Sequence, residues 1–91
     1  MMKAILPHIR VGLADDGRGL LVVDDLELYD VVEEFLSKQC LVFIESREVV
    51  RRPGGEVVTA VVSQRDAGAL EGFLGKLDAG MVEAVYRLNN P

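Results

Sequence analysis

Two pairs of adjacent acids are the residues of this chain whose types and spacing could support catalysis. Asp15 and Asp16 precede the apolar segment Leu20–Val23, and Asp24 and Asp25 follow it. Carboxylates at the end of a central strand can hold Mg²⁺ for phosphoryl transfer. The two pairs lie roughly 20 Å apart at ~3.3 Å per residue, so they cannot share one metal within a chain. Asp24 and Asp25 are the metal candidates, although such acids more often serve turns and helix caps.

Other residues with catalytic potential lack partners in the sequence. His8 has no nearby histidine, cysteine or metal-spaced acid. Cys40 also has no histidine nearby and, as the single cysteine, cannot form an internal disulfide. Residues 17–19 form a Gly-Arg-Gly turn without the third glycine and the helix of a dinucleotide-binding loop. The pattern therefore favours a protein that is not an enzyme and needs no cofactor.

Glycines give the sharpest anomaly. Gly68, Gly72 and Gly75 fall on one face of the second of two expected helices. Each costs a helix about 1 kcal/mol relative to alanine, a sizeable loss for a small domain. Glycines on one face allow another backbone to approach closely, which predicts an interface there. The alternative is an exposed helix whose glycines have no role.

Charged residues suggest two further surfaces. The first expected helix carries an acidic face that could attract a basic partner, formed by Glu27, Asp30, Glu33 and Glu34. An expected hairpin carries a basic group that could grip RNA or an acidic protein, formed by Arg47, Arg51 and Arg52. Both sets also have ordinary explanations, because charge runs usually face solvent and charged edge strands prevent aggregation. No aromatic residue stands beside the arginines to stack on a base.

Composition limits the classes of function. The 91 residues are 49% hydrophobic and 27% charged, with a net charge of −5. An acidic protein gains no general attraction to phosphate backbones, so nucleic-acid binding is disfavoured. No apolar run approaches the ~20 residues of a membrane-spanning helix, and the start of the chain is too short in apolar residues for a signal peptide. These features predict a cytoplasmic protein without a membrane association.

An internal echo predicts the fold. Residues 33–38 read E-E-F-L-S-K and residues 71–76 read E-G-F-L-G-K. Apolar strand-like segments precede both hexapeptides, Leu20–Val23 and Val57–Val62, and further strand-like segments follow them, Leu41–Phe43 and Val82–Tyr86. The echo predicts two strand–helix–strand halves joined by a turn at residues 53–55.

The expected elements can be placed along the chain. Asp24 or Asp25 begins the first helix, and Ser63 or Asp66 begins the second, which ends at Gly80. The hairpin arms are residues 40–52 and 56–64; if Arg52 pairs with Gly55, Arg51 faces Glu56 and Val49 faces Val58. Alternation of Val82, Ala84, Tyr86 and Leu88 predicts a last strand. An additional strand, Lys3–Leu13, should pair with Leu20–Val23; it then displaces the last strand, or crosses to another edge or another subunit.

These elements predict an α+β fold, a ferredoxin-like split βαβ (βαββαβ) two-layer sandwich. Its antiparallel sheet has both helices on one face, with the additional N-terminal strand beside it. We expect one domain over 1–91, with an N-terminal strand and turn (1–19), two halves (20–52 and 56–88) and a tail (89–91). The fold hosts many functions and does not select one.

The leading functional hypothesis is a small non-enzymatic binding or regulatory module. It is expected to be a homodimer that self-associates through the glycine face or a sheet edge. One alternative is a metal-dependent phosphodiesterase or nuclease that uses Asp24 and Asp25. Another is an acidic inhibitor or immunity-type protein that binds a basic target through the first helix.

Overall fold

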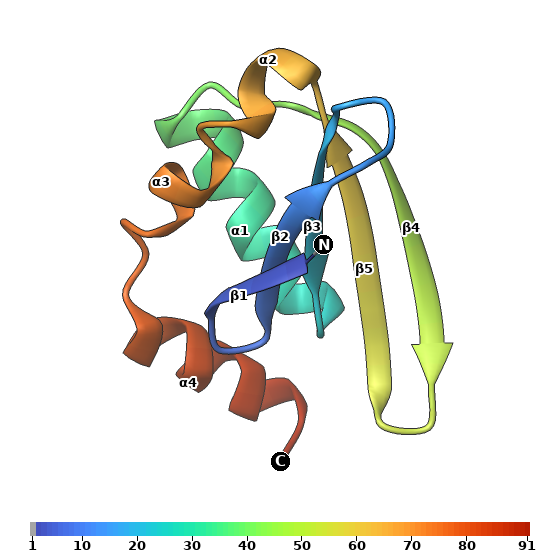
Figure 1. The fold of residues 1–91 in the computed structure, drawn as a ribbon. Helices are drawn as coiled ribbons and strands as arrows, with labels where there is room; N and C mark the ends of the chain where they lie inside the picture. The colour runs from blue at the N-terminus through green and yellow to red at the C-terminus, as the bar shows by residue number, and fades with distance from the viewer. Residues whose placement is uncertain (1) are drawn as a thin grey trace.

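A computed structural model describes residues 2–91 as an α+β fold with a five-stranded antiparallel sheet and four helices (Figure 1). The strand order across the sheet is β1-β2-β3-β5-β4. In chain order the elements are β1 Met2–Leu6, β2 Ile9–Leu13, β3 Gly19–Val23, α1 Leu26–Gln39, β4 Ile44–Arg52, β5 Gly55–Val62, α2 Gln64–Ala67, α3 Leu70–Leu74 and α4 Ala79–Asn89.

The two most continuously apolar segments form the middle of the sheet, as the sequence predicts. β3 pairs with β5, and their side chains alternate between a buried and a partly exposed side. The buried side meets α1, α3 and α4 in one core, which includes Leu21, Val58, Leu28, Leu74 and Val82. The helices lie together on that side of the sheet (Figure 1). The other side of the sheet faces away from them.

The N-terminal segment is a hairpin and not the single strand that Lys3–Leu13 predicts. β1 and β2 pair around a two-residue turn, Pro7-His8, with Leu6 opposite Ile9. Pro7 suits the first turn position, and His8 takes the second with a left-handed φ of 65°. β2 then pairs with β3 as expected. This hairpin occupies the side of β3 that the expected last strand would have taken.

The β4–β5 hairpin confirms the expected register. Arg52 pairs with Gly55, Arg51 with Glu56, and Val49 with Val58. β4 begins at Ile44, however, so the prediction that Leu41–Phe43 form a strand was wrong. Leu41 adopts a left-handed φ of 57° just after α1, which turns the chain before the strand begins.

The first helix also agrees with its sequence pattern. Asp25 is its N-cap and accepts a hydrogen bond from the backbone N–H of Leu28 at 2.9 Å. The apolar stripe buries Leu28, Val32 and Leu36 against the sheet. Lys38 and Glu34 form the expected i,i+4 pair at 3.0 Å.

The region after β5 contradicts two predictions. The single second helix is divided into α2 and α3, each five residues or shorter, because its three glycines lower helix propensity. The expected last strand, residues 82–88, is part of α4. Asp78 starts this helix as N-cap, accepting from the N–H of Gly80 at 2.9 Å. Gly80 therefore lies in the first turn of a helix instead of ending one.

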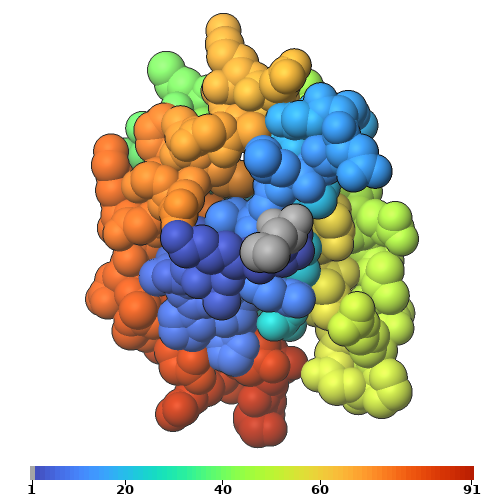
Figure 2. Space-filling view, viewed as in Figure 1, coloured from blue at the N-terminus to red at the C-terminus, as the bar shows by residue number. Residues whose placement is uncertain are grey.

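The ferredoxin-like order of elements is not confirmed, since the chain runs βββαββααα over residues 2–91. The antiparallel sheet with its helices on one side is present. In Figure 2 the blue N-terminal strands lie beside the orange and red C-terminal helices, and the yellow-green β4–β5 hairpin forms the opposite flank. Among residues 2–91, no helix is long and apolar enough to cross a membrane.

Candidate functional site

The metal candidates Asp24 and Asp25 are adjacent but hold different structural partners. Asp24 Oδ1 accepts from Arg10 Nη2 at 3.1 Å. The Asp25 side chain caps α1 and accepts from the side-chain amides of Asn89 and Asn90 at 3.4 and 3.1 Å. Asp25 is only 7% exposed, so it ties the start of α1 to the end of α4. Within residues 2–91 no group of three or more His, Cys, Asp or Glu side chains is placed to hold a metal.

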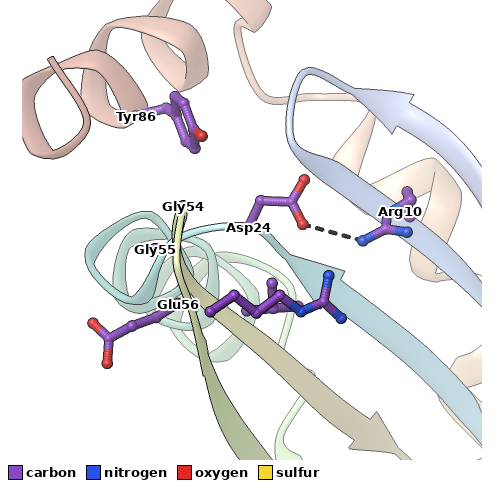
Figure 3. A pocket seen from close by; sticks show the side chains of 8 residues that line it. Arg10, Asp24, Gly54, Gly55, Glu56 and Tyr86 are labelled. Atoms are coloured by element: carbon purple, nitrogen blue, oxygen red, sulfur yellow. Dashed lines mark hydrogen bonds and ion pairs between the residues drawn. The ribbon is translucent and has the colours of Figure 1, made fainter.

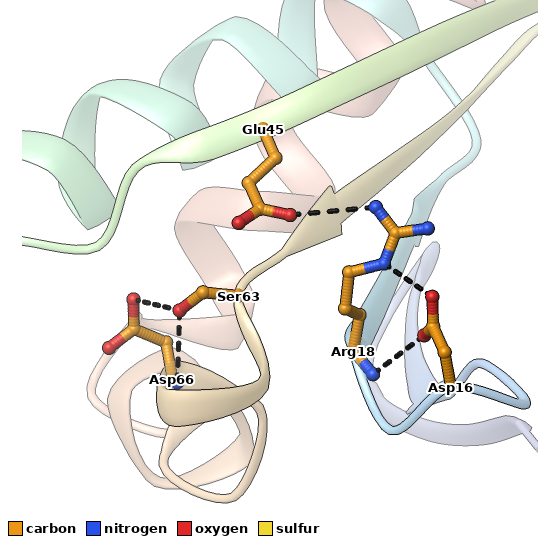
Figure 4. A network of polar contacts seen from close by, with 5 residues as sticks. All are labelled: Asp16, Arg18, Glu45, Ser63 and Asp66. Atoms are coloured by element: carbon orange, nitrogen blue, oxygen red, sulfur yellow. Dashed lines mark hydrogen bonds and ion pairs between the residues drawn. The ribbon is translucent and has the colours of Figure 1, made fainter.

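The other acidic pair lies at the opposite end of β3, as the sequence predicts. Asp16 accepts from the backbone N–H of Arg18 at 3.0 Å and from its Nε at 2.7 Å (Figure 4). These two hydrogen bonds hold the pKa of Asp16 below its ordinary value. Arg18 also lies 3.6 Å from Glu45 on β4. In the same figure Ser63, the N-cap of α2, bonds Asp66, so both groups serve turns and caps.

The acidic face and the basic hairpin partly neutralise each other. Arg47 lies 3.6 Å from Asp30 and also over the ring of Tyr29 at 5.4 Å from its centroid. Glu34 is paired with Lys38, which leaves Glu27 and Glu33 without an ion pair within residues 2–91. Arg51 pairs with Glu56 across the hairpin at 3.7 Å. Arg52 makes no ion pair within the same residues.

The glycines do not share a helix face. Gly68 ends α2, Gly72 lies within α3, and Gly75 ends α3. A Cβ added at Gly68 or Gly72 would have no atom within 4 Å. Both positions therefore point to open space, and the three glycines are divided between two short helices instead of lying on one.

A cleft of about 360 Å³ opens where the end of the sheet meets α4 (Figure 3). Arg10 and Asp24 form one wall, the turn at Gly54 and Gly55 another, and Tyr86 of α4 a third. The remaining lining residues are Arg52, Glu56 and Val57. In Figure 2 the red end of α4 and the tip of the yellow-green hairpin border a notch at the lower edge of the molecule.

Contacts behind the cleft fix the position of Tyr86. Its ring stacks on His8 with centroids 3.5 Å apart and an interplanar angle of 8°. His8 Nε2 lies 2.9 Å from Glu83 Oε2, and Arg87 Nε donates to Glu83 Oε1, also at 2.9 Å. The hydrogen bond from Arg87, with a smaller effect of His8, holds the pKa of Glu83 below its ordinary value. The carboxylate thus links the N-terminal turn to α4.

The side of the sheet away from the helices, here called the open face, is a second candidate surface. Its residues alternate with the core residues along β2, β3, β5 and β4. They comprise Arg10, Gly12, Leu20, Val22, Val57, Thr59, Val61, Ser46, Glu48, Val50 and Arg52. Leu20, Val22, Val57 and Val61 are partly exposed, and Val50 is 41% exposed. Apolar side chains therefore fill the middle of a surface that no helix of residues 2–91 covers.

Sequence reasoning missed both the cleft and the open face. His8 and Tyr86 are 78 positions apart, and no local pattern joins them. A signal for the open face existed, because Leu20–Val23 and Val57–Val62 are apolar on both parities. Comparisons of the chain with protein-family models, curated proteins and solved structures gave no match.

Proposed function

We propose that the chain is a small non-enzymatic binding module that self-associates, and that the open face of its sheet packs against the same face of a second copy. The observation that carries this proposal is the apolar centre of that face, which includes Leu20, Val22 and Val61. Apolar surface exposed to water favours association, because removing that surface from water lowers the free energy. Sheets that pack face to face bury such side chains in a layer about 10 Å thick.

The charges on the open face suit a second copy. In one row across the sheet, Arg10 pairs with Val22, Val22 with Thr59, and Thr59 with Glu48. The row therefore begins with a positive residue, which Asp24 partly compensates, and ends with a negative one. Glu48 makes no ion pair within residues 2–91.

A twofold axis between β3 and β5, parallel to the strands, makes this row complementary to itself. The axis exchanges the two ends of the row, so Arg10 of one subunit faces Glu48 of the partner subunit, and the pair occurs twice. Val22 then faces Thr59 of the partner subunit in the centre.

The size of the face sets the expected strength. Four strands spaced about 4.8 Å apart, each taken as five residues long, cover an area of about 19 Å by 17 Å. This is smaller than the roughly 800 Å² per partner of a standard interface. We therefore expect a reversible dimer with a dissociation constant in the micromolar range, near 1 μM or weaker.

Adjacent residues of β4 provide a matched test. Val50 lies on the open face and is 41% exposed, whereas Val49 lies on the opposite face and is 37% exposed. Val50→Lys should weaken the dimer at least tenfold, because it places a long charged side chain within the packed face. Val49→Lys adds the same charge to the same strand and should leave the dimer unchanged. Light scattering after size exclusion, over a range of concentrations, measures both.

The proposal fails if the unmodified chain stays at its 10.0 kDa monomer mass at every concentration. It also fails if Val49→Lys and Val50→Lys shift the dimer equally. Thermal melting of both variants shows that each one remains folded.

A further inference from the structure

We infer that the cleft between the β4–β5 turn and α4, which borders the open face and shares Arg10, Arg52 and Val57 with it, binds a small organic carboxylate. Two arginines line it, Arg10 and Arg52. A guanidinium offers several N–H donors in a planar fork that matches the two oxygens of a carboxylate. Arg52 makes no ion pair within residues 2–91, so its donors are not committed to the protein.

The charges that face the cleft favour an anion. Arg10 is held in place by Asp24 at 3.1 Å, and this pair is close to neutral. Glu56 also lines the cleft, but its carboxylate lies 3.7 Å from Arg51, and Figure 3 shows it turned away from Tyr86 and Asp24. Arg52 is therefore the uncompensated charge of the cleft, in a protein whose net charge is −5. The positive charge of Arg52 would attract a negative ligand to this cleft, although the protein as a whole is acidic.

The remaining walls suit an organic molecule better than an inorganic ion. Tyr86 presents a ring to the cleft, and its hydroxyl makes no side-chain hydrogen bond within residues 2–91. The stacked His8 ring fixes the orientation of that ring before a ligand arrives. A volume of about 360 Å³ lies in the range of small-molecule sites, roughly 300–1,000 Å³. The glycines of the turn leave the backbone open to the ligand.

The backbone conformation of His8 contributes to the fixed position of the Tyr86 ring beside the cleft. A histidine with φ of 65° occupies a conformation that non-glycine residues adopt in only a few per cent of cases. Such strain concentrates at ligand sites, where the surrounding contacts maintain it. Here the Glu83 contact and the Tyr86 ring hold the strained residue. The turn thus holds the His8 ring against Tyr86.

The experiment is an NMR titration of the ¹⁵N-labelled chain, read at the backbone amides of Gly54 and Gly55. The probe is 3-phenylpropionate, and the matched control is 3-phenylpropionamide, which has the same shape without the charge. We expect saturable shifts of both glycines with the carboxylate and at least tenfold weaker binding of the amide. A short peptide with a free C-terminus, compared with its C-terminal amide, shows whether the carboxylate comes from a peptide or from a free acid.

Two variants on one hairpin locate the charge that binds. Arg52→Gln should weaken 3-phenylpropionate at least tenfold, and Arg47→Gln, on the same strand but paired with Asp30 outside the cleft, should change its affinity less than twofold. Absence of shifts at Gly54 and Gly55 at about 10 mM probe overturns the inference, as do equal effects of the two variants. The same titration on Val22→Lys keeps the result independent of dimerisation. Binding to that variant leaves the carboxylate site intact even if self-association fails.

Discussion

Reversing the charges at the two ends of the open face should make two different variants prefer each other over themselves. Glu48→Arg places two positive groups opposite each other at both ends of a homodimer, and Arg10→Glu places two negative groups there. When the two variants are mixed, a positive residue of one subunit faces a negative residue of the other at both ends. One end of the mixed dimer keeps the native Arg10–Glu48 pair, and the other end carries the same pair reversed.

The size of this preference follows from the exposure of the charges. An exposed ion pair contributes about 0.5 kcal/mol, and replacing it by a like-charge contact costs about as much again. Two such contacts separate the mixed dimer from each homodimer by about 2 kcal/mol, which is roughly thirtyfold in affinity. Added salt should reduce the preference, since these charges are at the surface.

Native mass spectrometry of the mixed variants, with one chain isotope-labelled, measures the populations of the three dimers. A statistical mixture of one, two and one parts would refute the twofold axis between β3 and β5. Melting curves of the separate variants serve as controls, because Arg10→Glu also places an acid beside Asp24.

Other changes test the structure itself. Gly72→Ala should raise the free energy of unfolding by about 0.5–1 kcal/mol, because the added Cβ meets open space. Gly19→Ala should lower it, because the added Cβ would lie 2.6 Å from Val62. Urea unfolding measures both, and an equal effect would contradict the placement of the two glycines. Tyr29→Phe should leave the free energy of unfolding unchanged or raise it by up to about 1 kcal/mol, because the buried Tyr29 hydroxyl has no hydrogen-bond partner within residues 2–91. Burial, and less strongly Glu33, also raise the pKa of this hydroxyl, so a tyrosinate that titrates near pH 10 would contradict its burial. The pKa of Asp16 is lower in the folded chain than its ordinary 3.8, so its contribution to stability is present above pH 3.8 and disappears as pH falls through the lowered value. Asp16→Asn should therefore reduce the loss of stability between pH 3.8 and lower pH, as measured by urea unfolding at each pH. An unchanged pH dependence would show that the Arg18 contacts do not stabilise the fold.

The sequence predicts the middle of this fold well because the signals there are local. The turn at residues 53–55 sets the register of β4 and β5, and Asp25 starts α1 by capping it. Continuous apolar runs identify the two central strands. Each of these features depends on residues within a few positions of each other, which is the range over which turn and capping chemistry acts.

The C-terminal part was mispredicted because two patterns competed. Val82, Ala84, Tyr86 and Leu88 alternate, but Ala84 and Leu88 are exposed, and Leu88 is 81% exposed. The helical spacing of Met81, Val82, Val85 and Tyr86 fits the observed packing of α4 against the core. Asp78, an N-cap residue just before this segment, was the local signal that favours the helix.

The candidate sites were out of reach of the sequence for a different reason. The cleft depends on contacts between His8 and residues of α4 that lie at least 75 positions away. The open face exists because the helices all pack on one side of the sheet, and no single residue encodes that arrangement. The spacing of the glycines predicts one helix face, yet the residues are divided between α2 and α3.

The most direct measurement of self-association through the open face is an isotope-filtered NOE experiment. The sample contains equal amounts of ¹³C-labelled and unlabelled chain, so that only contacts between subunits are observed. Intermolecular NOEs between the methyl groups of Val22 and Thr59 are the predicted result. A dimer that shows none of these, with contacts instead from α2 and α3, would contradict the account.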